Sequence, residues 1–433
     1  MQFDLNYWYD EDRDGQMEFC FGQEEYGNYW KSFGKYKLIN GRAQKYEDFP
    51  ENISSLMPCN INNDKTIDYC GVILRGNDEN HSFDYKVYTN NELGENKDSP
   101  GSDLIIKLVD DEDSRPLWTT VWGGANTLAQ AVWRVRKERS ESEVHKFLDK
   151  LCVYTITDQD VCGGPPVDYA FSSHQWLRKT CGKELRFFWD ESAWLVQNTL
   201  GSMNWNEYAT HIQGHCHLGM LYPKNKYGVE GDTPSYLHVF PNGLNNPAVG
   251  NQVGWGGYFR WALSPDSLTE CFTNAAPDVK AVSEKYEKYF YPAIFADFAA
   301  RMDWAACGEG NHNPSVYVNG KKGLDPIIIT SKVGRRIWLD ASESIDVDND
   351  SLAYHWWILP EAGTYTGHIE IMQTDKPVAF FDIPQDAAGK ELHMICEVMD
   401  NGSPALTGYR RVIIRPVDKF VRLHIASYSH FKD

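Results

Sequence analysis

The sequence predicts two domains of different class: an α/β domain with a mainly parallel sheet, followed by an all-β sandwich. Between residues 99 and 189, short apolar segments typical of strands alternate with helical patterns, as expected for a parallel sheet with helices on its faces. After residue 316, apolar and polar residues alternate within short segments, as in an antiparallel sandwich. At 433 residues, the chain is also too long for one ordinary core.

The composition limits the classes of partner. The net charge is −19, which argues against nucleic acid because phosphate binding needs clustered Lys and Arg. No stretch approaches the ~20 apolar residues of a membrane span. With 15 Trp, 24 Tyr and 20 Phe, the chain favours a carbohydrate or small neutral ligand, although aromatic side chains are also ordinary core residues. The oligomeric state is not indicated.

Residues 1–95 are an atypical N-terminal part. They are rich in Asn, Asp, Glu and Tyr, and we expect loops with short elements from residue 36 to 96. The acidic run from Asp10 to Asp14 favours a solvated turn over a metal loop. The opening MQFDLNYWYDEDRDG has no basic start and no apolar run, so it does not resemble a signal peptide.

The segment Leu117–Arg136 is the centre of the α/β domain. Leu117–Val121 has the β-branched and aromatic residues of a buried strand, Gly123–Gly124 ends it, and a helical pattern follows. Ligands often bind where such a turn leaves the carboxyl end of a strand. Asn126 and Thr127 are therefore candidate substrate-binding residues. Alternatively, the glycines only let the helix pack closely on the strand.

Other elements follow from local signals. Helices are predicted over Ser99–Asp111, where Pro100 suits the first turn, over Ser140–Lys150, where Ser140 and Glu143 have capping-box spacing, and over Ser172–Thr180. Leu151–Ile156 and Leu185–Trp189 are predicted strands, residues 201–277 an irregular tract, and Val279–Trp304 helical with a kink or break at Pro292. Gly308–Ser315 is a linker before the sandwich at 316–418.

Two pairs of acids are candidate catalytic residues. Asp158 and Asp160 stand at the carboxyl end of a predicted strand, where an Asp either works chemically or caps the next helix. Glu230 and Asp232 lie between Gly231 and Pro234 in the irregular tract, where the alternative is a simple turn. We expect both pairs and the loop near Asn126 to line one pocket.

Further polar and aromatic residues are candidates for substrate binding. Asn242 and Asn245 in PNGLNNP could donate to sugar hydroxyls or only make turns. Trp255 and Arg260 in GWGGYFR could supply a stacking ring and a fixed charge.

Long strings of the sequence also resemble a known family. They are LWTTVWGGANTLAQAVWRVR (117–136), VYTITDQD (153–160), EGDTPSYLHVFPNGLNNP (230–247), GWGGYFR (254–260), FADFAARMDW (295–304) and LDASESIDVDNDSLAYHWW (339–357). The chain is similar over residues 95–415 to DUF1593-type, cellulose-binding proteins with a nucleoside-hydrolase-like α/β domain and a cadherin-like sandwich. The resemblance implies a nucleoside-hydrolase-like domain over 96–307, an immunoglobulin/cadherin-like domain over 316–418, and an extracellular location.

The resemblance also implies a chemistry. Nucleoside hydrolases cleave a glycosidic bond at a calcium ion held by carboxylates, so Asn126 and Asp160 become candidate calcium ligands. The family's Asp-x-x-x-x-Asp-Asp run is not found here, and Pro100 stands where relatives commonly have Glu. Either the chain lacks its true beginning or it is non-catalytic. We therefore expect a glycosyl-bond hydrolase acting on a carbohydrate or nucleoside-like substrate, active or inactive; the alternative is a non-catalytic polysaccharide-binding protein.

Overall fold

The computed structural model of the chain divides into two compact units. The structure describes residues 93–161, 172–222, 229–247 and 249–418 and, before them, seven strand segments between residues 3 and 87. Unit 1 comprises residues 1–189 and 262–272, and unit 2 comprises residues 190–261 and 273–433. The domain boundaries expected from the sequence, at 95, 307 and 316, stay predictions.

The N-terminal part contains more strand than expected. It forms antiparallel sheets of order β1-β2-β3-β4 and β5-β6-β7. Sheet ladders are backbone hydrogen bonds, so a strand depends on its pairing partner more than on its composition. This explains why the local sequence predicted mainly loops from residue 36 on. The bounds are β1 (Phe3–Tyr9), β2 (Glu18–Glu25), β3 (Tyr29–Ile39), β4 (Arg42–Asp48), β5 (Ile53–Cys59), β6 (Asp68–Arg75) and β7 (Asp84–Val87).

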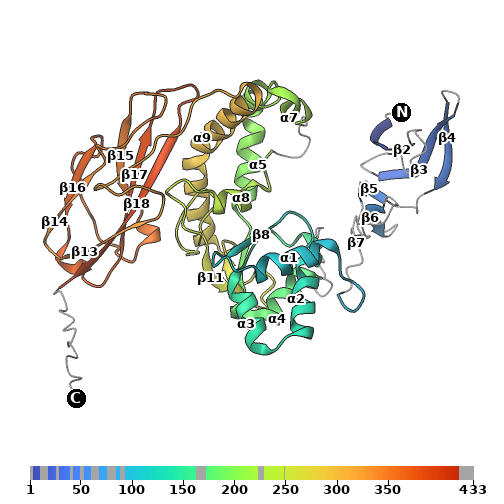
Figure 1. The fold of residues 1–433 in the computed structure, drawn as a ribbon, viewed down its shortest axis with the longest axis horizontal. Coiled ribbons are helices and arrows are strands. Elements are labelled where there is room, and N and C mark those ends of the chain that lie inside the picture. Colours follow the sequence, from blue (N-terminus) through green and yellow to red (C-terminus); the bar gives the residue numbers. More distant parts are fainter. Residues whose placement is uncertain are drawn as a thin grey trace, which may run out of the picture. The chain divides into compact units, whose positions relative to one another are not determined.

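The predicted α/β layer is confirmed (Figure 1). Its elements are α1 (Pro100–Asp110), β8 (Leu117–Val121), α2 (Asn126–Glu138), α3 (Glu141–Lys150), β9 (Leu151–Ile156), α4 (Ser173–Cys181), β10 (Arg186–Asp190), β11 (Arg260–Leu263) and β12 (Glu270–Thr273). They build a mixed, mainly parallel sheet of order β11-β12-β10-β9-β8, in which β8 and β9 run parallel. The turn between β11 and β12 is too short for a parallel crossover, so these two strands form a hairpin.

Local sequence signals position these elements. The predicted capping box of α3 is present, because the Ser140 N–H donates to Glu143 at 3.0 Å. A second capping box starts α1, where Ser99 and Ser102 exchange hydrogen bonds. On α2, Ala129 and Val132 are fully buried, as the helical spacing of apolar residues requires. The caps therefore fix the starts of α1 and α3, and the apolar face of α2 packs into the core of unit 1.

Unit 2 contains helices in the tract that was expected to be irregular. Its helices are α5 (Ala193–Met203), α6 (Trp205–His211), α7 (Cys216–Leu221), α8 (Thr233–Val239) and α9 (Pro277–Cys307). Three of these are short, so their sequences offer little periodicity to recognise. Helix α9 continues through Pro292, and the break proposed there as one alternative is wrong. Its start at Pro277 suits proline, whose missing N–H is not needed in the first turn.

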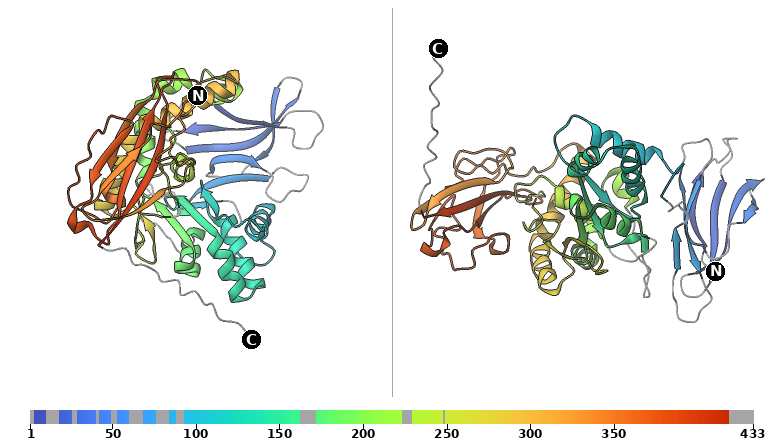
Figure 2. Two further views of the ribbon diagram at one scale, coloured as in Figure 1. Left: turned by 60° about the vertical axis from the view of Figure 1, so that its left-hand side comes forward. Right: turned by 90° about the horizontal axis from the view of Figure 1, so that it is seen from below.

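The C-terminal sandwich is confirmed, and its strands can be followed from two further sides in Figure 2. Its sheets have the orders β13-β18-β17-β15 and β14-β16. Strand β14 alternates between exposed and buried residues, and Trp356, Phe381 and Met394 fill the core. None of the described helices is long and apolar enough to cross a membrane. The strands are β13 (Ile327–Lys332), β14 (Arg336–Asp340), β15 (Ala353–Ile358), β16 (Val378–Asp382), β17 (Leu392–Met399) and β18 (Thr407–Val417).

Candidate functional site

Asp160 connects two loops of unit 1. Its Oδ1 accepts a hydrogen bond from the Ala125 N–H at 2.9 Å, and its Oδ2 accepts one from the His174 N–H at 2.8 Å. The first donor precedes α2 and the second lies in the first turn of α4, so both are N–H groups that a helix leaves unpaired. The carboxylate therefore caps α4 and holds the turn after β8. The capping alternative describes this geometry.

Asp158 lies beside Asp160 and is equally enclosed. Its Oδ2 accepts from the Ser172 hydroxyl at 2.7 Å, its Oδ1 accepts from the Asp160 N–H at 3.2 Å, and its side chain is 2% exposed. Burial raises the pKa of Asp158 to about 7, and burial also raises the pKa of Asp160. We call Asp158, Asp160, Ser172 and His174 the acid cluster.

His174 is neutral in this cluster. The Arg178 Nε–H donates to His174 Nδ1 at 3.2 Å, so Nδ1 is an acceptor and the proton belongs on Nε2. Nε2 lies 3.0 Å from the Thr155 hydroxyl. Burial, with the nearby Arg178 charge, lowers the pKa of His174 well below its usual value. Arg178 also pairs with Asp266 at 2.6 Å, and the cluster is thus one connected buried network.

The loop before α2 meets this network through its backbone. A Cβ on Gly124 would lie 2.7 Å from Asp160 Oδ1, so glycine there permits the close approach of the carboxylate. The contact uses the Ala125 N–H, whereas Asn126 is half-buried and Thr127 is exposed. The glycine therefore accommodates the Asp160 carboxylate, a contact that differs from the close helix–strand packing considered as the alternative. A role for the side chains of Asn126 and Thr127 stays a prediction.

The described residues do not fit the expected calcium site. Among them, no three His, Cys, Asp or Glu side chains converge as a metal site would require. Asp160, the expected acidic ligand, already accepts backbone hydrogen bonds with both oxygens. Calcium prefers six to eight oxygen ligands. Asp160 and Asn126 by themselves supply fewer oxygen atoms than that.

Glu230 and Asp232 belong to unit 2, whereas the acid cluster belongs to unit 1. Glu230 accepts hydrogen bonds from the Tyr222 and Thr233 hydroxyls and has a φ of 61°. Asp232 is exposed and occupies the position that precedes α8. Both residues fit the turn alternative, and one pocket shared with Asn126 and Asp158 stays a prediction.

Asn242 and Asn245 shape the loop that contains them. Asn245 donates to the Leu237 and Phe240 carbonyls at 2.8 and 2.7 Å and accepts from the Trp255 N–H at 2.9 Å, so its amide is fully used. Asn242 Oδ1 accepts from the N–H groups of residues 244 and 245. Its Nδ2 is buried without a partner among the described residues.

Trp255, predicted as a ligand-stacking ring, is a core residue in the structure. Its side chain is 2% exposed and stacks on Phe240, with ring centroids 5.4 Å apart. Moving a large apolar ring from water into the core is energetically favourable. The glycine-rich flanks allow the chain to fold around it. Arg260 is exposed and pairs with Asp278 at 2.7 Å.

A second pair of buried acids was not predicted from the sequence. Asp190 accepts from the N–H groups of Ser192, Ala193 and Trp194 at the start of α5, while Glu287 accepts from the Ser283 hydroxyl. Burial raises the pKa of Asp190, and it raises that of Glu287 to about 8. Asp190 is another carboxylate that serves as a helix cap.

A partly exposed aromatic pair was also missed. Trp338 on β14 faces Phe380 on β16, their ring centroids are 4.6 Å apart, and Trp338 is 54% exposed. Arg336 and Asp382 flank the rings and form a two-pronged ion pair at 2.9 and 2.8 Å. We call Trp338 and Phe380 the aromatic platform. Its signal was a Trp on the polar face of the alternating segment RIWLD.

Comparisons with known proteins identify the family. Residues 81–259 match "Cellulose-binding Sde182, nucleoside hydrolase-like domain", and residues 336–416 match "Cellulose-binding protein Sde0182, C-terminal domain". A solved nucleoside hydrolase-related protein from Saccharophagus degradans, described as associated with carbohydrate metabolism, is 36% identical with a TM-score of 0.67. The match covers 78% of this chain and 79% of that one. The chain belongs to the Sde182 family.

Smaller similarities concern part of the chain only. The PKD domain from the KIAA 1837 protein is 13% identical, with a TM-score of 0.18, over 26% of this chain and 96% of that one. Human CDH23 EC21–23 is 16% identical, with a TM-score of 0.19, over 24% and 33%. No curated protein matches. For the Sde182 family member described here, the expected family and both fold classes are confirmed.

Proposed function

We propose that this chain is a carbohydrate-binding protein that attaches to polysaccharide through the aromatic platform. The observation that carries the proposal is the exposure of Trp338 beside Phe380 on the outside of the sandwich. Exposed apolar groups that lie together commonly mark a binding surface. The C–H face of a pyranose ring is apolar and packs against such rings, while its hydroxyls need polar partners.

The surroundings of the platform supply those polar partners. The Arg336 guanidinium lies 4.6 Å from the Phe380 ring centroid, and its ion pair with Asp382 places donors and acceptors next to the rings. Both charged side chains are about half exposed, so sugar hydroxyls could reach them. A net charge of −19 favours an uncharged polymer. The name of the family points to the same ligand class.

Co-sedimentation with microcrystalline cellulose tests the proposal. Trp338→Ala should weaken binding at least tenfold, because one anchoring ring commonly contributes about 2 kcal/mol or more to an interface. Trp122→Ala is the matched control, since Trp122 is 58% exposed but lies in unit 1. Equal retention of the wild-type protein and Trp338→Ala would refute the platform as the binding surface.

A polysaccharide-binding role also leads us to propose an extracellular location.

Hydrolysis of a glycosidic bond is the second candidate, favoured by the pKa of Asp158. Burial raises this pKa to about 7, which suits a general acid or base at neutral pH. Release of nitrophenol from 4-nitrophenyl β-cellobioside, or of hypoxanthine from inosine, should then disappear in Asp158→Asn. Assays with and without calcium chloride test the expected cofactor. Turnover unchanged in this variant would eliminate Asp158 as the catalytic group.

A further inference from the structure

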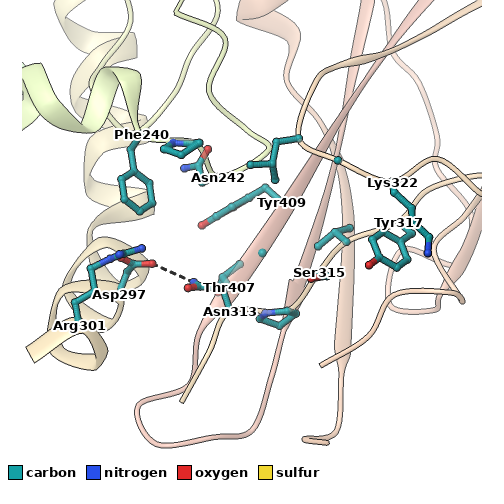
Figure 3. Close-up of a pocket in the computed structure, with 16 residues that line it drawn as sticks. Phe240, Asn242, Asp297, Arg301, Asn313, Ser315, Tyr317, Lys322, Thr407 and Tyr409 are labelled. Carbon is teal, nitrogen blue, oxygen red and sulfur yellow. Dashed lines mark hydrogen bonds and ion pairs between the residues drawn. The ribbon is translucent and has the colours of Figure 1, made fainter. Parts of the chain in front are cut away.

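Unit 2 contains a cavity of about 380 Å³. It lies between the side chains of α9, the loop around Asn242, the chain at 313–317 and the start of β18 (Figure 3). Ligand pockets range from roughly 300 to 1,000 Å³, so this one suits about one or two sugar rings. None of the candidate catalytic acids lines it.

One wall of the cavity contains Asp297, a buried carboxylate, and its partner Arg301. Asp297 is 5% exposed and accepts hydrogen bonds from Arg301 Nε at 2.5 Å and from Asn313 Nδ2 at 3.1 Å. The Arg301 guanidinium also lies over the Phe240 ring, 4.8 Å from its centroid. These contacts hold both side chains in place and balance their charges. This wall therefore offers fixed donors and acceptors without attracting a strongly charged ligand.

A second wall contains a hydrogen-bond donor that lacks an acceptor. Asn242 is 9% exposed and lines the cavity, and its Nδ2 is buried without a partner among the described residues. Its Oδ1 is fixed by the N–H groups of Leu244 and Asn245, so the amide cannot turn over without losing two hydrogen bonds. Buried donors are nearly always paired. An acceptor that enters the cavity would complete this one.

Aromatic rings complete the lining. Figure 3 shows Tyr409 extending from β18 toward α9, with Phe240 on the opposite side. Tyr317 lines the cavity near its Lys322 end, where the ammonium group lies 5.1 Å from the ring centroid. Rings, an unpaired amide donor and a neutralised ion pair together match a ligand with apolar C–H faces and many hydroxyls.

We propose that this cavity is a second carbohydrate site, which takes a neutral hexose unit of a soluble oligosaccharide or of a chain end. A ligand hydroxyl accepts from Asn242 Nδ2, and other hydroxyls pair with Asp297 and Arg301. The inference rests on the proposed carbohydrate-binding function but uses no residue of the aromatic platform. The two sites recognise different forms of the same ligand: an extended surface on the platform and an isolated sugar unit in the cavity.

Calorimetry of the full chain with cellotetraose tests the second site. Asn242→Asp retains the oxygen that accepts from residues 244 and 245 but replaces the free donor with an acceptor, and affinity should fall about tenfold. Ser315→Phe fills the cavity and should abolish binding. Asn246→Asp makes the same chemical change on the same loop outside the lining, and should stay within about twofold of wild type.

The outcomes separate this inference from the proposed function. If Asn242→Asp and Ser315→Phe lose cellotetraose yet still co-sediment with cellulose, both proposals stand. If the wild type binds cellulose but no cellotetraose, or if Ser315→Phe binds cellotetraose as the wild type does, the cavity is overturned and the platform is unaffected. If the wild type binds neither ligand, the proposed function fails and the inference fails with it. Circular dichroism confirms that each variant is folded.

Discussion

The acid cluster of unit 1 and the cavity of unit 2 use the same residue types in opposite ways. In the cluster, Asp158 and Asp160 are enclosed, and the oxygens of Asp160 accept from N–H groups at two loops. In the cavity, Asp297 and Asn242 line open space, and one amide donor has no described partner. The cluster joins the turn after β8 to the start of α4. The cavity, in contrast, has a hydrogen-bond donor left for a ligand.

This difference limits what a perturbed pKa can indicate. Such shifts often mark functional sites, yet Asp160 and Asp190 have raised pKa values and both act as helix caps. Burial is the main cause of both shifts, and a buried cap produces it as readily as a catalytic pocket does. Unused hydrogen-bonding capacity beside a cavity is the more selective signal in this molecule.

The largest expected effect is on stability, at Asp160. Asp160→Ala leaves the buried N–H groups of Ala125 and His174 without acceptors, at roughly 1–3 kcal/mol each, so the free energy of unfolding should fall by about 2–6 kcal/mol. Urea denaturation measures the loss, and hydrogen exchange in residues 172–181 locates it. Asp160→Asn, which retains one acceptor, should lose less. A loss below about 1 kcal/mol would remove the contrast with the cavity.

The pH dependence of stability at Asp158 should be smaller. Its pKa is about 7 in the folded state, against an ordinary value of 3.8, so the folded state retains a proton that the unfolded state releases. Its contribution is fully present below pH 4 and disappears as pH rises to about 7. The free energy of unfolding of wild type relative to Asp158→Asn should therefore fall by about 2–4 kcal/mol over that range.

Denaturation of both proteins at several pH values measures this change. The two proteins share Asp160, His174 and Arg178 around the site, as well as Glu287, whose own raised pKa acts in the same direction. Their contributions therefore largely cancel in the difference. A difference that does not vary with pH would show that Asp158 is ionised throughout.

Gly124→Ala tests how tightly the cluster is packed. The added methyl group would lie 2.7 Å from Asp160 Oδ1, and overpacking of this kind costs roughly 1–3 kcal/mol. Thr127→Ala, at an exposed position at the start of α2, should change the melting temperature little. If Gly124→Ala and Thr127→Ala have the same melting temperature, the acid cluster relaxes around the added methyl group and is not rigid.

The smallest effect is expected at Arg260. It forms an ion pair with Asp278, and both side chains are about half exposed or more, where solvent screens such pairs and they contribute little to stability. Arg260→Ala should leave the midpoint of urea denaturation essentially unchanged. Loss of cellulose binding in this variant would support the predicted substrate-binding role of Arg260 and weaken the case for the platform as the surface that attaches to cellulose.

Much of the fold could be predicted from local sequence. The predicted strand Leu151–Ile156 has the observed bounds of β9, and the capping box at Ser140 forms as expected, because periodicity and caps are local properties. The short helices of unit 2 and the N-terminal strands were not predicted, since their stability depends on partners elsewhere in the chain. Trp255 is a further example: the sequence shows an aromatic residue there, but its burial depends on distant contacts and could not be predicted.

The sequence by itself determined the two fold classes, the order of the main strands and helices, and the family, because each of these is encoded in contiguous residues. Only the tertiary structure decided which polar groups are satisfied and which face open space. The acceptor for Ala125 lies 35 residues away in Asp160, and Asn242 shares its cavity with residues as distant as Tyr409. Hydrogen bonding and burial depend on such contacts, which no local pattern records.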